Sequence, residues 1–338
     1  MGRAISDDFK KDLLEGKLSN LLEAVHNDNT LIMELRGDSV IIYYRGGALY
    51  TITSIETGYN IAFNMAYCAK KKLYLEIEEN PSIENAVKYI AFYKHQMDFH
   101  RANADRELEK QGQQQLILEN NILGGKKQGE KTDISKSSTG DYYVLDMEYA
   151  YKASGIEARF DTVAVHWPSL GNRRKSGKNL GISFLELKYF DGAMGNKSGI
   201  GKHISDFVKF TTDEKYKKAY INMCKDMETV FKQKCELGLL PAYTSRLNME
   251  NPKYSTITID PNKTELIFVF INRDPDSSVA ARELHKCYLK YGKEKLSNVY
   301  MATSSDVGYM LFRYGDNCKQ DRYITLTDYI KSYGYEVE

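Results

Sequence analysis

The fold is decided by the stretch ARFDTVAVHW at residues 158–167, followed by GISFLELKYF at residues 181–190. Both segments are rich in apolar, β-branched and aromatic residues, which predicts two β-strands. Successive side chains of a strand point to opposite faces, so Glu186 and Lys188 share one face and the leucines beside them share the other. Asp161 lies on the first strand, and at matching height its carboxylate meets that of Glu186.

These three side chains form a candidate site, because charged groups are costly to bury on an apolar strand without partners. Mg²⁺ prefers carboxylate, water and phosphate oxygens, so a converging Asp161 and Glu186 predict a magnesium site. A same-face ion pair between Glu186 and Lys188 is the alternative, since such pairs are common and contribute little at a surface. The residues alone leave both interpretations open.

The surrounding elements predict a mixed α/β domain. Runs with strand character lie at 142–151, 158–167, 181–190, 265–271 and 299–303. Helices are expected at 103–121, after a capping box formed by Thr211 and Glu214, and at 277–291, where Gly292 closes the last of them. The resulting order is helix, three strands, helix, strand, helix, strand, which fits a mixed sheet flanked by helices.

A separate domain is expected over residues 1–100. Residues 7–25 have helical spacing of apolar residues, and Asn80 followed by Pro81 predicts a further helix start. Strand-like runs separated by turn residues lie at 31–36, 40–44, 48–55, 59–64 and 73–77. This pattern predicts a leading helix and a β-meander, whose role the sequence does not indicate.

The pattern of Asp161, then Glu186-x-Lys188 on the next strand, resembles the motif of the PD-(D/E)XK nuclease superfamily. Asp161 matches the first acidic residue of that motif, and Glu186 and Lys188 match the second acid and the lysine. Phe160 stands where the motif has proline, a position that varies in the superfamily. The resemblance covers about residues 103–303 and rests on the strand context, because the motif itself is short.

The resemblance implies a restriction-endonuclease-like core within a domain over residues 103–338. The implied activity is hydrolysis of nucleic-acid phosphodiester bonds, endo- or exonucleolytic, with Mg²⁺ or Mn²⁺ as cofactor. Asp161 and Glu186 would bind the metal, and Lys188 would orient or help deprotonate the attacking water. DNA is favoured over RNA as substrate, and a role in restriction or antiviral defence is implied by resemblance alone.

An additional acidic residue completes the metal shell in many members of that superfamily. Glu148, on the strand before Asp161, is the residue we expect in this catalytic and metal-binding role. Asp146 lies on the same strand and is the weaker candidate. A solvated acid on a strand is the alternative interpretation of Glu148.

Basic residues near the motif are the expected contacts to the nucleic-acid backbone. Those between the two motif strands are Arg173, Arg174, Lys175 and Lys178, and those in the glycine-rich stretch GAMGNKSGIGKHISDF at 192–207 are Lys197, Lys202 and His203. Backbone N–H groups in such a stretch, next to a helix start, suit a phosphate. A solvated turn and a plain loop are the alternatives.

Composition and charge narrow the functional classes. Lys and Arg number 47 against 46 Asp and Glu, and this net charge of +1 excludes a globally basic coat. The five cysteines include no C-x-x-C pair, which argues against structural zinc and a disulfide framework. No apolar run is long enough for a membrane span and no signal core is present, so a cytoplasmic protein is expected.

Two other functions stay open. One is a catalytically inactive subunit that keeps the nuclease fold for nucleic-acid binding or assembly, against which the intact set of Asp161, Glu186 and Lys188 argues. The other is an unrelated α/β interaction protein in which Glu186 and Lys188 are only an ion pair. A homo-oligomer, or a partner protein bound through the N-terminal domain, is compatible with each of these functions.

Overall fold

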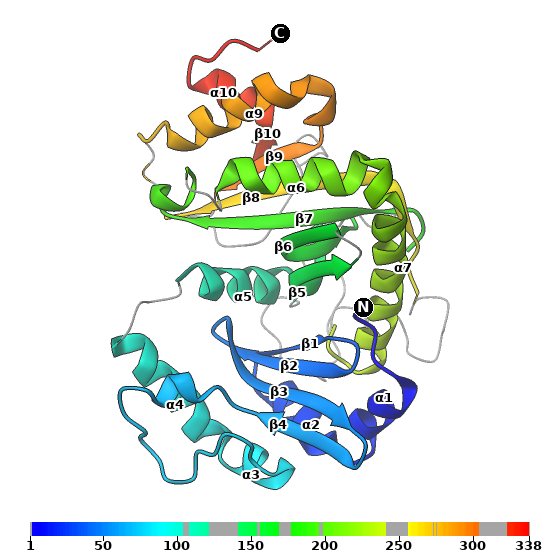
Figure 1. Ribbon diagram of the computed structural model, residues 1–338, viewed down its shortest axis with the longest axis vertical. Helices are drawn as coiled ribbons and strands as arrows, with labels where there is room; N and C mark the ends of the chain where they lie inside the picture. The colour runs from blue at the N-terminus through cyan, green and yellow to red at the C-terminus, as the bar shows by residue number, and fades with distance from the viewer. Residues whose placement is uncertain are drawn as a thin grey trace, which may run out of the picture. The chain divides into compact units, whose positions relative to one another are not determined.

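The computed structural model describes residues 2–103, 108–121, 141–153, 156–168, 177–195, 199–240, 256–272, 274, 276–303 and 323–337. These residues form a mixed α/β protein with two sheets and divide into two compact units (Figure 1). The first unit holds the described residues up to Leu118 and those of 229–256. The second holds 119–121 and the described residues of 138–228 and 257–338. No helix in the described part of the chain is long and apolar enough to cross a membrane.

The first unit contains an antiparallel sheet with the strand order β1-β2-β3-β4. Its strands are β1 (Leu31–Leu35), β2 (Ser39–Tyr44), β3 (Gly47–Ile55) and β4 (Gly58–Ala62). Arg45 and Gly46 form the turn between β2 and β3, and their φ angles of 50° and 77° match a type I′ hairpin. A side chain at Gly46 would also collide with the backbone of Lys110, so glycine is required there.

The helices of the first unit differ in part from those expected. They include α1 (Asp7–Leu14), α2 (Ser19–Asn27), the 3₁₀ helix η1 (Met65–Cys68), α3 (Ile83–Lys88), α4 (Ile90–Asn103) and most of α5 (Leu108–Asn121). The single helix expected over 7–25 is two helices, because the backbone leaves helical geometry at Glu15, where φ is −143°. The Leu18 N–H then donates to the Asp12 carbonyl at 2.9 Å.

The prediction of a strand over residues 73–77 is wrong. The Leu73 N–H donates to the Gln96 side chain on α4 at 2.8 Å instead of to a neighbouring strand. Gln96 also donates to the carbonyls of Tyr67 and Lys71, both at 2.8 Å. A buried glutamine therefore satisfies this segment without a sheet.

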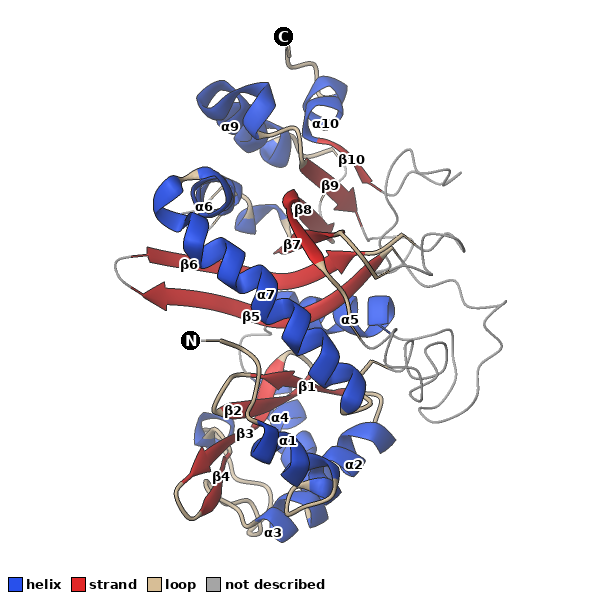
Figure 2. Ribbon diagram, turned by 90° about the vertical axis from the view of Figure 1, so that its right-hand side faces the viewer, coloured by secondary structure: helices blue, strands red, loops and turns tan. Residues whose placement is uncertain are grey.

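The second unit contains a mixed sheet with the order β10-β9-β8-β7-β6-β5 (Figures 1 and 2). Its strands are β5 (Tyr142–Ala153), β6 (Ile156–His166), β7 (Leu180–Tyr189), β8 (Ile259–Ile271), β9 (Val299–Thr303) and β10 (Tyr323–Thr325). Strands β5, β6 and β7 pair in antiparallel fashion, whereas β7, β8 and β9 are parallel. The strands expected from β5 to β9 are confirmed, and β10 adds an antiparallel edge that the sequence did not predict.

The helices of the second unit follow its strands along the chain. They include the 3₁₀ helix η4 (Asp191–Ala193), α6 (Ile200–Thr212), the first part of α7 (Glu214–Glu236), α9 (Val279–Lys295) and α10 (Leu326–Ser332). Figure 1 shows α6 running along β7, where Phe207 and Phe210 contact Phe184 with ring centroids 6.0 and 6.3 Å apart. Gly292 interrupts α9 with a φ of 78°, but helical residues continue beyond it.

Two helix starts are capped by residues other than those expected. Ser82, rather than Asn80, caps α3 with its side chain. Thr211 belongs to the last turn of α6 and does not cap α7. Asp213 lies directly before α7 and accepts the backbone N–H of Lys215 at 2.9 Å, as a helix-capping aspartate does.

A buried ion pair attaches the end of α7 to the first unit. Lys234 Nζ lies 2.9 and 2.8 Å from the two carboxylate oxygens of Glu34 on β1, and the side chains are 3% and 1% exposed. Gln233 exchanges two hydrogen bonds with the backbone of Ile5, at 2.9 and 2.7 Å. These partners are far apart in the sequence, so the first unit includes chain from both sides of β5–β7.

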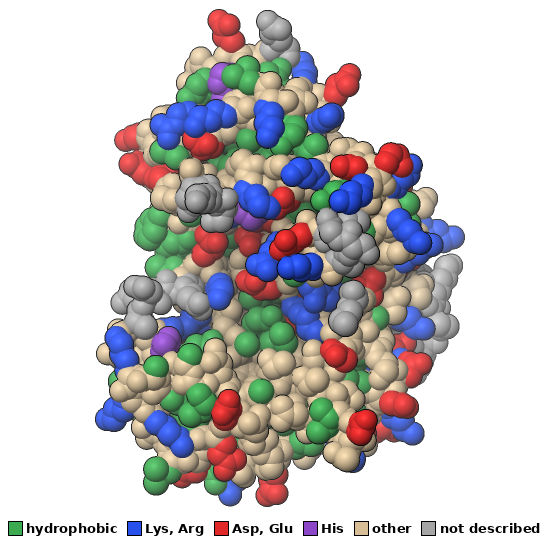
Figure 3. Space-filling model, viewed as in Figure 1, with side chains coloured by type: hydrophobic (Ala, Val, Ile, Leu, Met, Phe, Trp, Pro, Cys, Tyr) green, Lys and Arg blue, Asp and Glu red, His purple; other side chains and the backbone are tan. Residues whose placement is uncertain are grey.

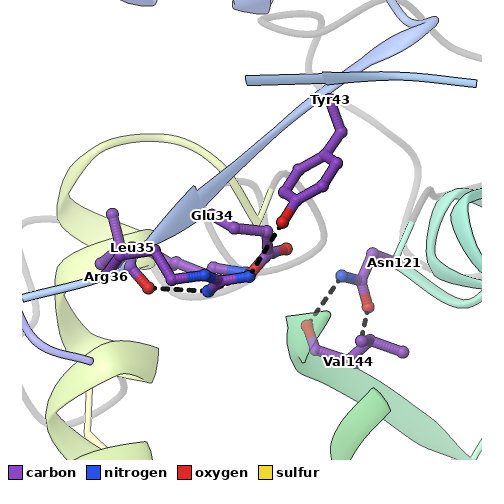
Figure 4. A network of polar contacts seen from close by, with 7 residues as sticks. Glu34, Leu35, Arg36, Tyr43, Asn121 and Val144 are labelled. Carbon is purple, nitrogen blue, oxygen red and sulfur yellow. Dashed lines mark hydrogen bonds and ion pairs between the residues drawn. The ribbon is translucent and has the colours of Figure 1, made fainter. Parts of the chain in front are cut away.

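Arg36 extends this buried polar group along the first sheet (Figure 4). Its guanidinium lies 4.0 Å from Glu34 and donates to the Leu35 carbonyl at 2.8 Å and to the Tyr43 hydroxyl at 3.4 Å. The Glu34 carboxylate thus has the cationic groups of both Arg36 and Lys234 within 4.0 Å. A buried carboxylate needs such compensation.

Along the chain, the boundaries between the two units fall within helices α5 and α7, whereas the sequence predicted a boundary near residue 100. Gln114 on α5 donates to the Thr30 carbonyl at 2.7 Å and accepts the Gly46 N–H, so most of α5 belongs to the first unit. Asn121 at the end of α5 exchanges hydrogen bonds of 2.9 and 2.8 Å with the Val144 backbone in the second unit (Figure 4).

Candidate active site

The backbone pairing between β6 and β7 stops at the two acidic residues of the motif. The last paired residues are Thr162 and Leu185, and Asp161 and Glu186 form the next row. Beside that row the Leu187 N–H donates to Asp161 Oδ2 at 2.9 Å, and within it the Asp161 N–H donates to Glu186 Oε1 at 3.2 Å. Each carboxylate thus accepts a hydrogen bond from the backbone of the other strand, and the two acids meet where the ladder ends.

The Glu186 carboxylate is fully buried and its second oxygen faces two nitrogen atoms. His203 Nδ1 lies 2.7 Å from Oε2, and Lys188 Nζ lies 4.0 Å from the same oxygen. His203 is 15% exposed and belongs to the first turn of α6, whose N-cap is Gly199. A helix N-terminus favours negative charge, so α6 adds to the compensation of the buried carboxylate.

Lys188 is 3% exposed, and its ammonium donates to the Leu187 carbonyl at 2.8 Å. Its separation from Glu186 contrasts with Lys234, which contacts both oxygens of Glu34 within 2.9 Å. The close buried pair of Glu34 and Lys234 therefore has a different geometry from that of Glu186 and Lys188. An ion pair alone does not describe Lys188, because its nearest acceptor is a backbone carbonyl.

Glu148 lies in the same row as Asp161 and Glu186. The pairings of its two chain neighbours with β6 place it opposite Asp161. Its φ of 57° is costly for a glutamate within a strand, and its side chain is exposed, whereas Asp146 is buried. Backbone strain of this kind clusters at functional sites.

Glu148 is nevertheless not brought into a cluster with the other two acids. Among the described residues, no group of three or more His, Cys, Asp or Glu side chains is arranged to hold a metal ion. The structure therefore places Asp161 beside Glu186 and Lys188 Nζ 4.0 Å from Glu186, and it places Glu148 in the same row on the exposed surface of β5.

Of the residues expected to contact nucleic acid, some lie outside the described residues, two are exposed, and one faces the candidate active site. Arg173, Arg174, Lys175 and Lys197 lie outside the described residues. Lys178 is exposed before β7, and Lys202 is exposed on α6, where its ammonium pairs with Asp206. His203 instead faces Glu186. On the face of the molecule drawn in Figure 3, Lys and Arg side chains are interspersed with Asp and Glu.

The sequence predicted His203 as a nucleic-acid contact and not as a neighbour of Glu186, although the helical spacing contains a signal for this position. His203 lies three residues after Ile200 and four before Phe207, and both of these side chains are buried. Residues at these spacings share one helix face. The face of α6 that packs on the sheet therefore also carries His203.

A second buried polar cluster lies on the same sheet. Ser183 Oγ donates to Glu265 Oε1 at 2.7 Å, and His166 Nδ1 lies 3.8 Å from that oxygen. Ser183 and Glu186 are on opposite faces of β7, because side chains alternate along a strand. This cluster is therefore separate from the candidate active site, and it partners the buried Glu265 carboxylate.

Comparisons of the chain with protein family models, with curated proteins and with solved structures found no match. The row that contains Asp161 and Glu186, together with Lys188, is therefore the feature of the chain that bears on its function.

Proposed function

We propose that the second unit is a metal-dependent nuclease of the PD-(D/E)XK type, with a restriction-endonuclease-like core and DNA as the favoured substrate. The observation that carries the proposal is the end of the β6–β7 ladder, where Asp161 and Glu186 exchange hydrogen bonds with each other's strand. Lys188 supports it, because its ammonium is buried 4.0 Å from Glu186, and burying a charge without a close counter-charge is costly, which favours a function for this lysine beyond packing.

The oxygen atoms at this row fit a hard divalent cation. Asp161 and Glu186 offer carboxylates, held by the backbone N–H groups of Leu187 and Asp161 at 2.9 and 3.2 Å. Mg²⁺ is commonly held by one or two carboxylates, with waters and phosphate oxygens completing its shell. Two acids therefore suffice, and Glu148 is an additional ligand candidate. When bound, such a cation supplies polarisation of a phosphoryl oxygen and a water of lowered pKa.

The protein's own groups then have distinct roles. Asp161 and Glu186 provide the negative charge that holds the cation. The backbone N–H groups that donate hydrogen bonds to them fix the orientation of both carboxylates. Lys188 presents a donor at the edge of the same site, where it can position the attacking water. His203 restrains Glu186 from the side of α6.

Purified protein is expected to cleave nucleic acid only with Mg²⁺ or Mn²⁺, and Asp161→Asn is expected to remove the activity, because it removes a negative ligand. The assay compares linear, circular and single-stranded DNA with RNA. Glu157→Gln, which neutralises an exposed acid on the same strand β6, is the matched control and should cleave normally. Wild-type cleavage in excess EDTA would contradict the proposal, and metal-independent binding without cleavage would favour an inactive nucleic-acid-binding subunit.

His203→Ala is expected to weaken divalent-cation affinity about 10-fold to 100-fold, because a group that orients a metal ligand is lost. His203→Asn retains a side-chain N–H near the position of Nδ1 and is expected to recover part of the affinity. Isothermal titration with Mn²⁺ measures both variants, with His285→Ala on α9 as the control. Equal affinity of His203→Ala and the wild type would show that the contact with Glu186 does not support metal binding.

A further inference from the structure

An exposed aromatic ring lies two positions beyond Lys188. Phe190 is 52% exposed, and the other strongly exposed large apolar residues in the part of the chain that the structure describes are aliphatic: Leu14, Ile55, Leu75 and Leu289. Phe190 directly follows β7, the strand that carries Glu186 and Lys188. Its position thus links an exposed ring to the carboxyl end of the candidate active-site strand.

The backbone of Phe190 is in a conformation that is almost restricted to glycine. Its φ is 60° and its ψ is 161°, and side chains with a Cβ are strained in this region. The Phe190 N–H donates to the Ile271 carbonyl at 3.1 Å, which ties the residue to the end of β8. Asp191 accepts the Asp274 N–H at 3.1 Å and fixes the next residue.

Burial does not account for this strain. The hydrophobic effect favours moving a phenyl ring away from water, yet the ring stays exposed and contacts Tyr189 edge-on, with centroids 4.6 Å apart at 83°. Glycine would relieve the backbone and expose no ring. A strained and exposed aromatic residue that directly follows the candidate active-site strand, with its backbone N–H bonded to β8, therefore indicates a binding function.

We propose that Phe190 stacks on an unpaired nucleobase of the substrate, an inference that rests on the proposed nuclease function. Stacking on an aromatic ring tolerates every base, because each base has a π-face, and it requires a base that is not paired in a duplex. The position two residues after Lys188 suits a base close to the phosphate that is cleaved. The substrate class is accordingly a single strand or a locally unpaired strand.

The test measures affinity for a fluorescein-labelled single-stranded oligonucleotide by anisotropy, with EDTA present so that no cleavage occurs. Phe190→Ala and Phe190→Leu are expected to weaken binding about 5-fold to 100-fold, the range for base–aromatic stacking, whereas Phe190→Tyr is expected to bind normally. Leu289→Ala, which removes another exposed apolar side chain of the same unit, is the matched control. Affinity for a blunt duplex of the same sequence should change little in any variant.

Phe190→Gly supplies a readout that does not depend on nucleic acid. It is expected to weaken single-strand binding as Phe190→Ala does, while its melting temperature exceeds that of Phe190→Ala because the backbone strain is relieved. Unchanged affinity in Phe190→Ala, or normal binding by Phe190→Leu, overturns base stacking and leaves the nuclease proposal intact if the wild type cleaves. A wild-type protein that neither binds nor cleaves overturns both.

Discussion

Lys188→Ala is expected to reduce Mg²⁺-dependent cleavage about 10²-fold to 10⁴-fold, the contribution of a well-placed proton donor or acceptor. Cation affinity should be kept, because Asp161 and Glu186 hold the ion and the substitution removes a nearby positive charge. Single-turnover cleavage measures the first effect and isothermal titration with Mn²⁺ the second. Cleavage by Lys188→Ala at the wild-type rate would show that Lys188 has no part in the chemical step and only packs beside Glu186.

Lys188→Arg distinguishes two roles of the lysine, electrostatic positioning of the attacking water and proton transfer. Arginine keeps the positive charge but does not release a proton at working pH. Partial activity in Lys188→Arg with none in Lys188→Ala would indicate electrostatic positioning of the water. No activity in either variant, with cation and nucleic-acid binding intact, would indicate proton transfer or a geometry that only lysine satisfies.

Lys234→Met is expected to lower the free energy of unfolding by about 3–5 kcal/mol, because it leaves the Glu34 carboxylate buried without the ammonium that contacts both of its oxygens. Urea denaturation followed by circular dichroism measures the change. Combining Lys234→Met with Glu34→Leu is expected to recover part of the loss, since no buried carboxylate is left without its ammonium and Arg36 keeps its hydrogen bonds to Leu35 and Tyr43.

The matched control for this loss lies on the same helix. Lys217 and Glu214 form an exposed ion pair on α7, with 2.9 Å between the charged atoms. Lys217→Met is expected to cost less than about 1 kcal/mol, as exposed pairs do. A loss in Lys234→Met that does not exceed the loss in Lys217→Met would contradict the structural role of the buried pair.

The strands of the second unit could be predicted because each is a run of apolar residues between turn residues, as β7 and β8 show. The sequence also placed Glu186 and Lys188 on one face of a strand. It could not establish the register of β6 against β7, since the residues between the strands do not determine which pair comes last. The meeting of Asp161 with Glu186 follows from the Thr162–Leu185 pairing, which is a property of the folded sheet.

Other features could not be predicted from the sequence, because they depend on packing between distant segments. The contact of His203 with Glu186 requires α6 to lie against the sheet, and local spacing indicates only which face of the helix is buried. The segment 73–77 has strand-like residues but no neighbouring strand to pair with, so Gln96 satisfies it instead. Alternating or apolar character is thus necessary for a strand and not sufficient.

The division of α7 between the units affects the order in which a nascent chain can fold. Lys234 follows Glu34 by 200 positions, and Gln233 follows Ile5 by 228. On the ribosome, β1 is complete long before the lysine and glutamine that close its polar contacts have been synthesised. The first unit therefore finishes folding only after strands β5, β6 and β7 have emerged, and until then its incompletely buried apolar surface is prone to aggregation.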